Sequence, residues 1–200
     1  HTQTQDAVEA LSGDLHEGTI VKGYSGFYYV SFEGELYECS LRGKNRQKKV
    51  KFVPGDKVLF RIGEGVDDDT RGGAIEELLP RKNELVRPPV ANLDQLVILT
   101  ALADPAPDLR LIDRLTVFAQ WNEVTPVLCF NKADLVNQEA QDKLKEIYGP
   151  TGFPIVFCST VTGEGIEDVK ALLHGKFSVL AGNSGVGKSS LMNAISDRWN

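Results

Sequence analysis

One short stretch, residues 182–189, constrains the fold of this chain more than any other part of the sequence. It reads GNSGVGKS and fits the pattern G-x-x-x-x-G-K-[ST], between the apolar run FSVLAG and the helical pattern LMNAI. A glycine-rich turn between a buried strand and a helix directs backbone N–H groups at a phosphate, beside the positive end of the helix. The sequence therefore predicts a phosphate-binding loop in an α/β sheet.

The phosphate loop supplies most of the expected ligand contacts. Lys188 is predicted to reach the β and γ phosphates and the Ser189 hydroxyl to bind Mg²⁺, so these two residues are the catalytic candidates. The whole predicted loop comprises Gly182, Asn183, Ser184, Gly185, Val186, Gly187, Lys188, Ser189 and Ser190.

The second half of the chain alternates apolar runs with helical patterns. The runs 95–101, 126–131, 154–159 and 177–182 are nearly continuous, as in parallel strands covered on both faces. Between them lie three apolar stripes with helical spacing. The stripes are Leu111, Ile112, Leu115, Phe118 and Ala119; Ala140, Leu144 and Ile147; and Ile166, Val169, Leu172 and Leu173. This alternation predicts a doubly wound sheet whose ligands bind at the carboxyl ends of the strands.

Polar motifs follow two of these strands. The second strand ends in NKAD, residues Asn131, Lys132, Ala133 and Asp134. A carboxylate at Asp134 can accept from guanine N1–H and the 2-amino group together, which adenine cannot offer, while Asn131 can contact the O6/N7 edge. Lys132 would lay its methylene stem against the base and ribose. The alternative is an ordinary helix start capped by Asp134.

The third strand ends in CSTVTGEGI. Ser159 and Thr160 are placed to bring a backbone N–H to guanine O6, before Gly163 and Gly165 lead into a helix. Serine and threonine after a strand also cap helices, so a purely structural role remains open.

The N-terminal half has a different pattern. Short β-rich runs between residues 18 and 80, with glycine or aspartate at the breaks, predict a five-stranded barrel such as the OB-fold. Residues 1–17 are predicted to be a mobile tail, and the prolines of 81–93 predict an extended linker before an α/β domain at 94–200.

A basic stretch interrupts this barrel. Between Cys39 and Gly55 there are six basic residues and no acidic one, although the whole chain carries a net charge of −6. The six are Arg42, Lys44, Arg46, Lys48, Lys49 and Lys51. Such a loop on an OB-fold indicates RNA binding, with Tyr24, Phe27, Tyr28 and Tyr29 available for stacking. A solvated loop and core aromatics are the alternatives.

Composition argues against several classes of protein, namely membrane, secreted, disulfide-rich and zinc-ribbon proteins. No run approaches the roughly 18 apolar residues that a membrane crossing needs, and the N-terminus has no signal-like apolar core. Three cysteines without a CxxC pair favour neither a disulfide framework nor a zinc ribbon. We expect a cytoplasmic, monomeric protein without membrane contact.

The order of the motifs is unusual. The guanine-reading motifs of a GTPase normally follow the phosphate loop, whereas here they precede it, as in a circularly permuted domain whose remainder follows Asn200. A barrel, the segment RPPVANLDQ, then NKAD, CST and GNSGVGKSS in that order resemble the ribosome small-subunit-dependent GTPase A family. These are circularly permuted bacterial GTPases of late small-subunit assembly.

The resemblance implies an OB-fold barrel followed by a partial, circularly permuted P-loop GTPase domain. It also implies GTP or GDP with Mg²⁺, a Zn²⁺-binding C-terminal domain outside this chain, and the small ribosomal subunit and its rRNA as partners. Two departures stand out: no DxxG motif follows the phosphate loop, and Val161 stands where many GTPases have a lysine.

Three functions fit this sequence. The first is a GTP-hydrolysing factor that binds rRNA through the barrel. The second is a module that binds RNA and nucleotide without appreciable hydrolysis, since no DxxG is present after the phosphate loop. The third, an ATPase, is disfavoured by Asp134.

Overall fold

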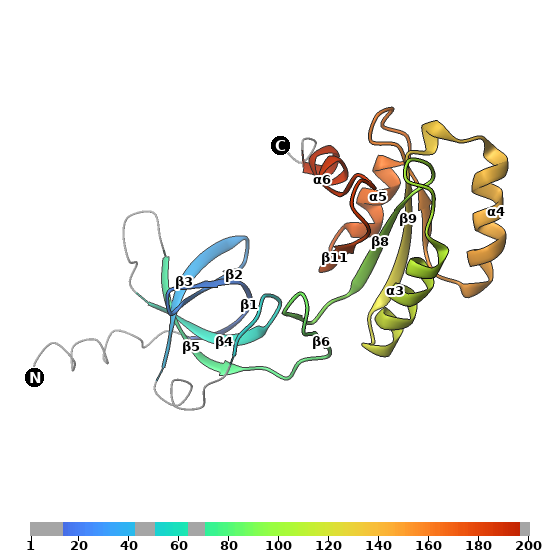
Figure 1. Cartoon of the computed structure of the whole chain (residues 1–200). Helices are drawn as coiled ribbons and strands as arrows, with labels where there is room; N and C mark the ends of the chain where they lie inside the picture. Colours follow the sequence, from blue (N-terminus) through green and yellow to red (C-terminus); the bar gives the residue numbers. More distant parts are fainter. Residues whose placement is uncertain (1–13, 43–50, 64–70, 197–200) are drawn as a thin grey trace, which may run out of the picture. The chain divides into compact units, whose positions relative to one another are not determined.

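The chain forms two compact units that divide between Asn92 and Leu93. The structure is a computed structural model and describes residues 14–42, 51–63 and 71–196. Figure 1 shows the strands of the first unit and the alternating strands and helices of the second. The two units are described one at a time.

The first unit is a closed five-stranded barrel. Its strands are β1 (Leu15–Tyr24), β2 (Phe27–Phe32), β3 (Glu35–Leu41), β4 (Lys57–Gly63) and β5 (Arg71–Leu78). They follow the order β1-β2-β3-β5-β4, and β4 pairs with β1 to close the ring. All neighbours are antiparallel except β3 and β5. The predicted five-stranded barrel is therefore confirmed.

Alternating side chains of these strands fill the barrel. Ile20, Val30, Cys39 and Phe60 are almost fully buried there, as period-two alternation on a closed sheet requires. Burial raises the pKa of the Cys39 thiol to about 12, with a smaller contribution from the charge of Glu38. Cys39 is thus a neutral, free cysteine of the barrel core.

The first strand begins earlier than the sequence suggested. Leu15, His16 and Glu17 were predicted to belong to a mobile tail, but they pair with Arg61, Phe60 and Leu59 of β4. The ring of His16 also packs 4.9 Å from that of Phe32. Polar residues at the start of a strand carry no local signal, so only the partner strand reveals where β1 begins.

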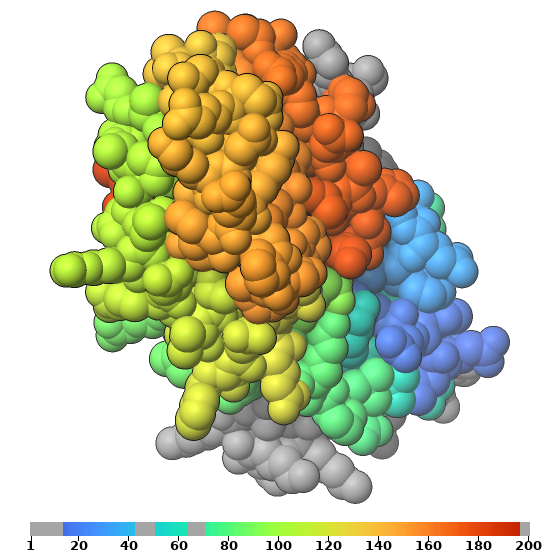
Figure 2. Space-filling model, turned by 90° about the vertical axis from the view of Figure 1, so that its right-hand side faces the viewer, coloured from blue at the N-terminus to red at the C-terminus, as the bar shows by residue number. Residues whose placement is uncertain are grey.

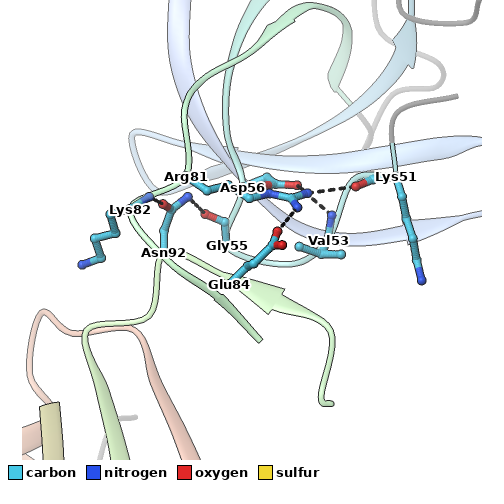
Figure 3. Close-up of polar contacts among 8 residues, drawn as sticks. All are labelled: Lys51, Val53, Gly55, Asp56, Arg81, Lys82, Glu84 and Asn92. Carbon is cyan, nitrogen blue, oxygen red and sulfur yellow. Dashed lines mark hydrogen bonds and ion pairs between the residues drawn. The ribbon is translucent and has the colours of Figure 1, made fainter. Parts of the chain in front are cut away.

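The predicted extended linker is instead a short hairpin. Strands β6 (Glu84–Leu85) and β7 (Val90–Ala91) pair antiparallel. The Arg81 guanidinium donates to both carboxylate oxygens of the fully buried Asp56, at 2.7 and 2.9 Å, and also bonds Glu84 and the Lys51 carbonyl (Figure 3). These hydrogen bonds, chiefly those to Asp56, raise the pKa of Arg81 although partial burial opposes the shift.

Asn92 completes the attachment of the hairpin to the first unit. Its side chain accepts from the Lys82 N–H and donates to the Gly55 carbonyl, both at 2.9 Å (Figure 3). Since a buried ion pair that loses one partner costs about 3–5 kcal/mol, Asp56 and Arg81 fix this segment firmly. Proline content alone predicted an extended chain and could not predict this long-range pair.

The second unit is a four-stranded parallel sheet. Its strands are β8 (Gln95–Ala101), β9 (Thr125–Asn131), β10 (Ile155–Phe157) and β11 (Ser178–Ala181), in the order β10-β9-β8-β11. All three pairings are parallel. The α/β expectation is confirmed, and each strand lies within one or two residues of its predicted run.

Helices cover both faces of this sheet (Figure 1). The helices are α3 (Leu109–Trp121), α4 (Gln138–Tyr148), α5 (Ile166–Leu173) and α6 (Lys188–Ser196), with short 3-10 turns η1 (Ala133–Leu135) and η2 (Gly149–Thr151). Ile166, Val169, Leu191 and Ile195 bring α5 and α6 to one face of the sheet. On α3 the buried residues are Ile112, Thr116 and Ala119. Phe118, predicted for the buried stripe, is instead 40% exposed.

Among the described helices, none combines the length and apolar character that crossing a bilayer requires.

Candidate functional site

The predicted site residues follow three parallel strands at their carboxyl ends. NKAD begins at the end of β9, CST begins after β10, and the phosphate loop joins β11 to α6. Because the strands are parallel, all three loops leave the same edge of the sheet. The residues that the sequence analysis grouped by chemistry are therefore grouped in space.

Asn131 joins these three loops. Its side chain is 1% exposed; Nδ2 donates to the Val186 carbonyl at 3.0 Å and Oδ1 accepts from the Thr160 N–H at 3.3 Å. One amide thus connects NKAD to both the phosphate loop and the CST loop. The sequence predicted a contact of Asn131 with guanine and did not foresee this bridging role.

Gly187 explains why the bridge can form. A Cβ at this position would lie 2.3 Å from the Asn131 Nδ2, and the residue has a φ of +96°. Any other amino acid would both displace the Asn131 amide and strain the backbone. The second glycine of the phosphate-loop pattern is therefore required for packing as well as for turning.

Ser159 sets the position of the Asp134 carboxylate. Its hydroxyl donates to Asp134 Oδ1 at 2.6 Å and accepts from the Val161 and Thr162 N–H groups at 3.3 and 3.1 Å. Ser159 is fully buried, whereas Asp134 is exposed. Ser159 therefore does not cap α5, whose N-cap is Gly165; it closes a turn in its own loop and holds the Asp134 carboxylate in place.

Backbone contacts hold the CST loop against NKAD. The Ala133 N–H donates to the Cys158 carbonyl at 3.0 Å, and the Cys158 N–H donates to the Phe130 carbonyl at 2.8 Å. Gly165 has a φ of +69°, and a Cβ there would lie 2.0 Å from the Phe157 carbonyl oxygen. Only glycine at position 165 allows the loop to pass this close to the Phe157 carbonyl at the end of β10.

Sequence reasoning missed the loop that follows β8. Lys132, in the left-handed region with a φ of +63°, donates its amine to the Asp104 carbonyl. Pro105 lies within 3.8 Å of the Cβ position of Gly185. Because β8 lies between β9 and β11 in the sheet, the loop after β8 lies between NKAD and the phosphate loop. A prediction of the strand order from the sequence could therefore have identified this loop as part of the site.

A pair of cysteines lies beneath the site. The sulfur atoms of Cys129 and Cys158 are 3.8 Å apart, and both residues are fully buried. The contact with Cys158, together with burial, raises the pKa of the Cys129 thiol. Cys129 is therefore protonated at neutral pH and acts as a small apolar residue.

The phosphate loop is anchored at one point and open elsewhere. Val186 is buried, whereas Asn183, Ser184 and Gly185 are exposed. The Lys188 amine donates to the Gly182 and Asn183 carbonyls at 2.8 and 2.6 Å. The loop thus holds its own lysine across the turn, where an anion would compete for the amine.

These residues fit a guanine nucleotide with Mg²⁺. Asp134 offers an exposed carboxylate oriented by Ser159, and Lys188 offers a cation over a glycine-rich turn with Ser189 exposed at the start of α6. Among the described residues there is no cluster of histidine, cysteine, aspartate and glutamate that could hold a metal ion. A nucleotide's own phosphates, together with Ser189, would complete the ligand set of Mg²⁺.

Comparison with known families agrees with this site. Residues 78–200 match the RsgA GTPase family and residues 17–72 match the RsgA N-terminal domain family. The chain belongs to the RsgA GTPase family. Two solved structures also resemble it, the crystal structure of YjeQ from Thermotoga maritima and that of YloQ, described as a circularly permuted GTPase. The YjeQ structure is 39% identical with a TM-score of 0.80, and the match covers 92% of this chain and 66% of the YjeQ chain. The YloQ structure is 35% identical with a TM-score of 0.78, and the match covers 92% of this chain and 65% of the YloQ chain.

Several relatives carry the name small ribosomal subunit biogenesis GTPase RsgA. Those from Agathobacter rectalis, Moorella thermoacetica and Carboxydothermus hydrogenoformans are 42%, 46% and 49% identical, in each case over 90% of this chain. The chain spans 60–62% of the length of these relatives. The permuted order of motifs therefore reflects the architecture of the RsgA family.

The predicted RNA-binding residues lie largely outside the described residues; this applies to Lys44, Arg46, Lys48 and Lys49. Arg42 forms an ion pair with Glu76 of β5 at 2.8 Å, and Lys51 is exposed. Arg42 is thus attached to the barrel wall, at the start of the basic stretch.

The four aromatic residues considered for stacking differ in their surroundings. Tyr24 is 75% exposed and Phe27 is also exposed. Tyr28 packs against Phe52 with ring centroids 4.9 Å apart, and the Tyr29 hydroxyl donates to Glu38 at 2.7 Å. Tyr28 and Tyr29 therefore contribute to the barrel, and Tyr24 and Phe27 remain the candidates for stacking.

Proposed function

We propose that this chain binds GTP and GDP with Mg²⁺ at the rim formed by the loops after β8, β9, β10 and β11. The observation that carries the proposal is the Asn131 amide, which bonds the Val186 carbonyl and the Thr160 N–H at once. One buried side chain that joins a base-reading loop to a phosphate-binding loop supports the assignment of both loops to a single nucleotide.

Each residue has a distinct part in this proposal. Asp134 accepts from guanine N1–H and the 2-amino group, and Ser159 holds its carboxylate in place. The Lys132 stem, held at the Asp104 carbonyl, lies along the base and ribose. Lys188 and the N–H groups of 182–190 bind the phosphates, and Ser189 binds Mg²⁺, which neutralises charge on the phosphate oxygens when bound.

We further propose that the protein hydrolyses GTP and acts on the small ribosomal subunit, contacting its rRNA. Family membership and the relatives' names support this role. The RNA contact is assigned to Arg42, Lys44, Arg46, Lys48, Lys49 and Lys51. A cytoplasmic monomer suits a factor that meets free ribosomal subunits. The resemblance also implies Zn²⁺, and this proposal assigns it to none of the described residues, among which no ligand cluster is found.

A second candidate function is binding of RNA and nucleotide without appreciable hydrolysis. It is favoured by the roles assigned above, which bind the base, the phosphates and Mg²⁺ and leave no residue assigned to position the attacking water.

Two measurements test these proposals. Calorimetric titration of the chain with GDP and with ADP should show binding of GDP and at least about 100-fold weaker binding of ADP. Equal affinities would contradict the guanine assignment. GTP turnover measured with and without purified small subunits then separates the two functions, since stimulated turnover supports the GTPase factor and its absence supports the binding module.

A further inference from the structure

Helix α3 has an apolar stripe on the side that faces away from the sheet. Its inner side buries Ile112, Thr116 and Ala119, which is enough to attach a surface helix. On the outer side, however, Val117 is 64% exposed and Trp121 is 87% exposed. Packing within the α/β unit therefore does not explain this second stripe.

The outer stripe borders a hollow in the surface. Asp113, Arg114, Val117, Phe118 and Trp121 line a groove of about 450 Å³, a volume in the range of small-ligand sites. These residues follow the i, i+3, i+4, i+7 spacing that places side chains on one side of a helix. Figure 2 shows the yellow-green segment that contains α3 uncovered beside α4. The groove is thus a shallow, open surface lined mostly by apolar side chains of α3.

Positive charge accompanies the groove. Arg110 and Arg114 are exposed and lie on this same side, one helical turn apart. Within the described part of the chain, neither has a hydrogen bond or ion pair through its side chain. The one acidic group of the groove, Asp113, accepts a hydrogen bond from the Tyr148 hydroxyl at 3.0 Å. Two arginines without partners are therefore available to an anionic ligand.

We propose that this α3 groove binds an unpaired nucleotide of RNA. The base would stack on Trp121 and Phe118, and the arginines would contact the adjoining phosphates. Seven residues of helix place Arg114 about 10 Å from Trp121 along the axis, within the reach of one or two nucleotides. The inference rests on the RNA-binding part of the proposed function and adds a contact surface on the α/β unit.

Other occupants fit the surface less well. A second copy of this chain would bring the same patch to both sides of a two-fold contact, so that arginines would face arginines. A protein partner would have to supply both acidic groups and an aromatic or aliphatic side chain. RNA supplies the negative charge and the flat apolar surface in every nucleotide.

Fluorescence of Trp121 gives a direct test. The sequence contains two tryptophans, so the change Trp199→Phe leaves Trp121 as the single reporter. Titration with single-stranded oligouridylate should quench this fluorescence, whereas an RNA duplex of equal length should quench it less. Trp121→Ala should weaken oligouridylate binding about 5- to 100-fold, measured by anisotropy of a labelled oligonucleotide, and Trp121→Phe should restore most of it.

Charge and control variants make the test specific. Arg110→Gln with Arg114→Gln should lower the slope of log K against log salt by about 1.4, from the loss of two phosphate contacts to a single strand. Ile147→Ala, which removes an exposed apolar side chain of the neighbouring helix α4, should leave RNA binding unchanged. GDP affinity should be the same in all of these variants.

The outcomes separate this inference from the proposed function. If replacing Lys44, Arg46, Lys48 and Lys49 by alanine abolishes RNA binding while the α3 variants bind normally, the groove proposal is overturned and the barrel assignment stands. Quenching of Trp121 by a protein or by self-association, with none by RNA, also overturns it. If the unaltered chain binds no RNA, both proposals fail.

Discussion

The two ends of the proposed nucleotide site differ in how far the fold has prepared them. At the proposed guanine end, Ser159 bonds the Asp134 carboxylate, and the buried Asn131 amide bonds the Thr160 N–H. At the phosphate end, Asn183, Ser184 and Gly185 are exposed, and Lys188 bonds the carbonyls of its own loop. One end is fixed before a ligand arrives, and the other must exchange internal contacts for the ligand's phosphates.

This difference indicates how affinity and selectivity are divided. A neutral base can be recognised by fixed partners at little ordering cost, because nothing there has to move. The binding free energy of a highly charged phosphate comes mostly from one cationic side chain and from the N–H groups of a loop that changes conformation to surround the phosphate. Base selectivity should therefore depend on the hydrogen-bonded residues of the loops after β9 and β10. Phosphate affinity should depend mainly on Lys188.

The largest effect is expected for Asp134→Ala. GDP binding should weaken about 100-fold or more, because two hydrogen bonds to a carboxylate contribute about 1.5–3 kcal/mol each. ADP binding, measured in the same calorimetric series, should not change. Glu146→Ala, which removes an exposed carboxylate from α4, serves as the control. A variant that binds GDP and ADP with the original ratio would show that Asp134 does not read the base.

Lys188→Ala addresses the phosphate end. GDP affinity should fall about 10- to 100-fold through loss of a charge-assisted contact, whereas guanosine, which has no phosphate, should bind as before. The free energy of unfolding should change little, since the two loop carbonyls that lose a partner are exposed at Asn183 and only partly buried at Gly182, where water can replace the amine. Lys176→Ala is the matched control. Equal losses for GDP and guanosine would mean that the two ends are not separable.

Asn131→Ala should affect both ends together. Removing a buried amide leaves the Val186 carbonyl and the Thr160 N–H without their partner, at a cost of about 1–3 kcal/mol in unfolding free energy. GDP binding should weaken about 10-fold, from disorder in both loops. Asn137→Ala removes the N-cap of α4 and should cost about 1 kcal/mol without changing GDP affinity. Chemical denaturation and calorimetry measure the two quantities.

The smallest effect is expected for Ser159→Ala. Asp134 would lose one charge-assisted hydrogen bond, which orients its carboxylate but does not touch the nucleotide, so GDP affinity should fall about 3- to 10-fold while ADP affinity stays constant. Ser196→Ala, which removes a hydroxyl at the end of α6, should have no effect. A loss as large as that of Asp134→Ala would indicate that Ser159 contacts the nucleotide itself.

Local patterns predicted the elements and motifs well. The apolar runs of β8 to β11 could be placed because strands buried on both faces have no polar alternation. The order of NKAD, CST and the phosphate loop was sufficient to predict a permuted domain, and the RsgA family match confirms it. Strand β3 lies among the short β-rich runs predicted between residues 18 and 80, since its residues alternate between the core and the surface.

Features that depend on contacts distant in sequence could not be predicted. The side of α3 that Phe118 faces is decided by packing on β8 and β9, and apolar character alone placed it wrongly. The hairpin β6–β7 depends on Arg81 reaching Asp56, 25 residues away. The bridge made by Asn131 required the close approach that Gly187 permits, which only the folded chain reveals.

The most direct test of the site is a change of base specificity with Asp134→Asn. Xanthosine diphosphate carries a carbonyl where guanine has its 2-amino group, and an asparagine amide can donate to it. The unaltered chain should prefer GDP over xanthosine diphosphate, and the variant should reverse that preference in calorimetric titration, while Lys188→Ala in either background weakens both ligands equally. If Asp134→Asn leaves the ratio of the two affinities unchanged, Asp134 and the phosphate loop do not bind one guanine nucleotide.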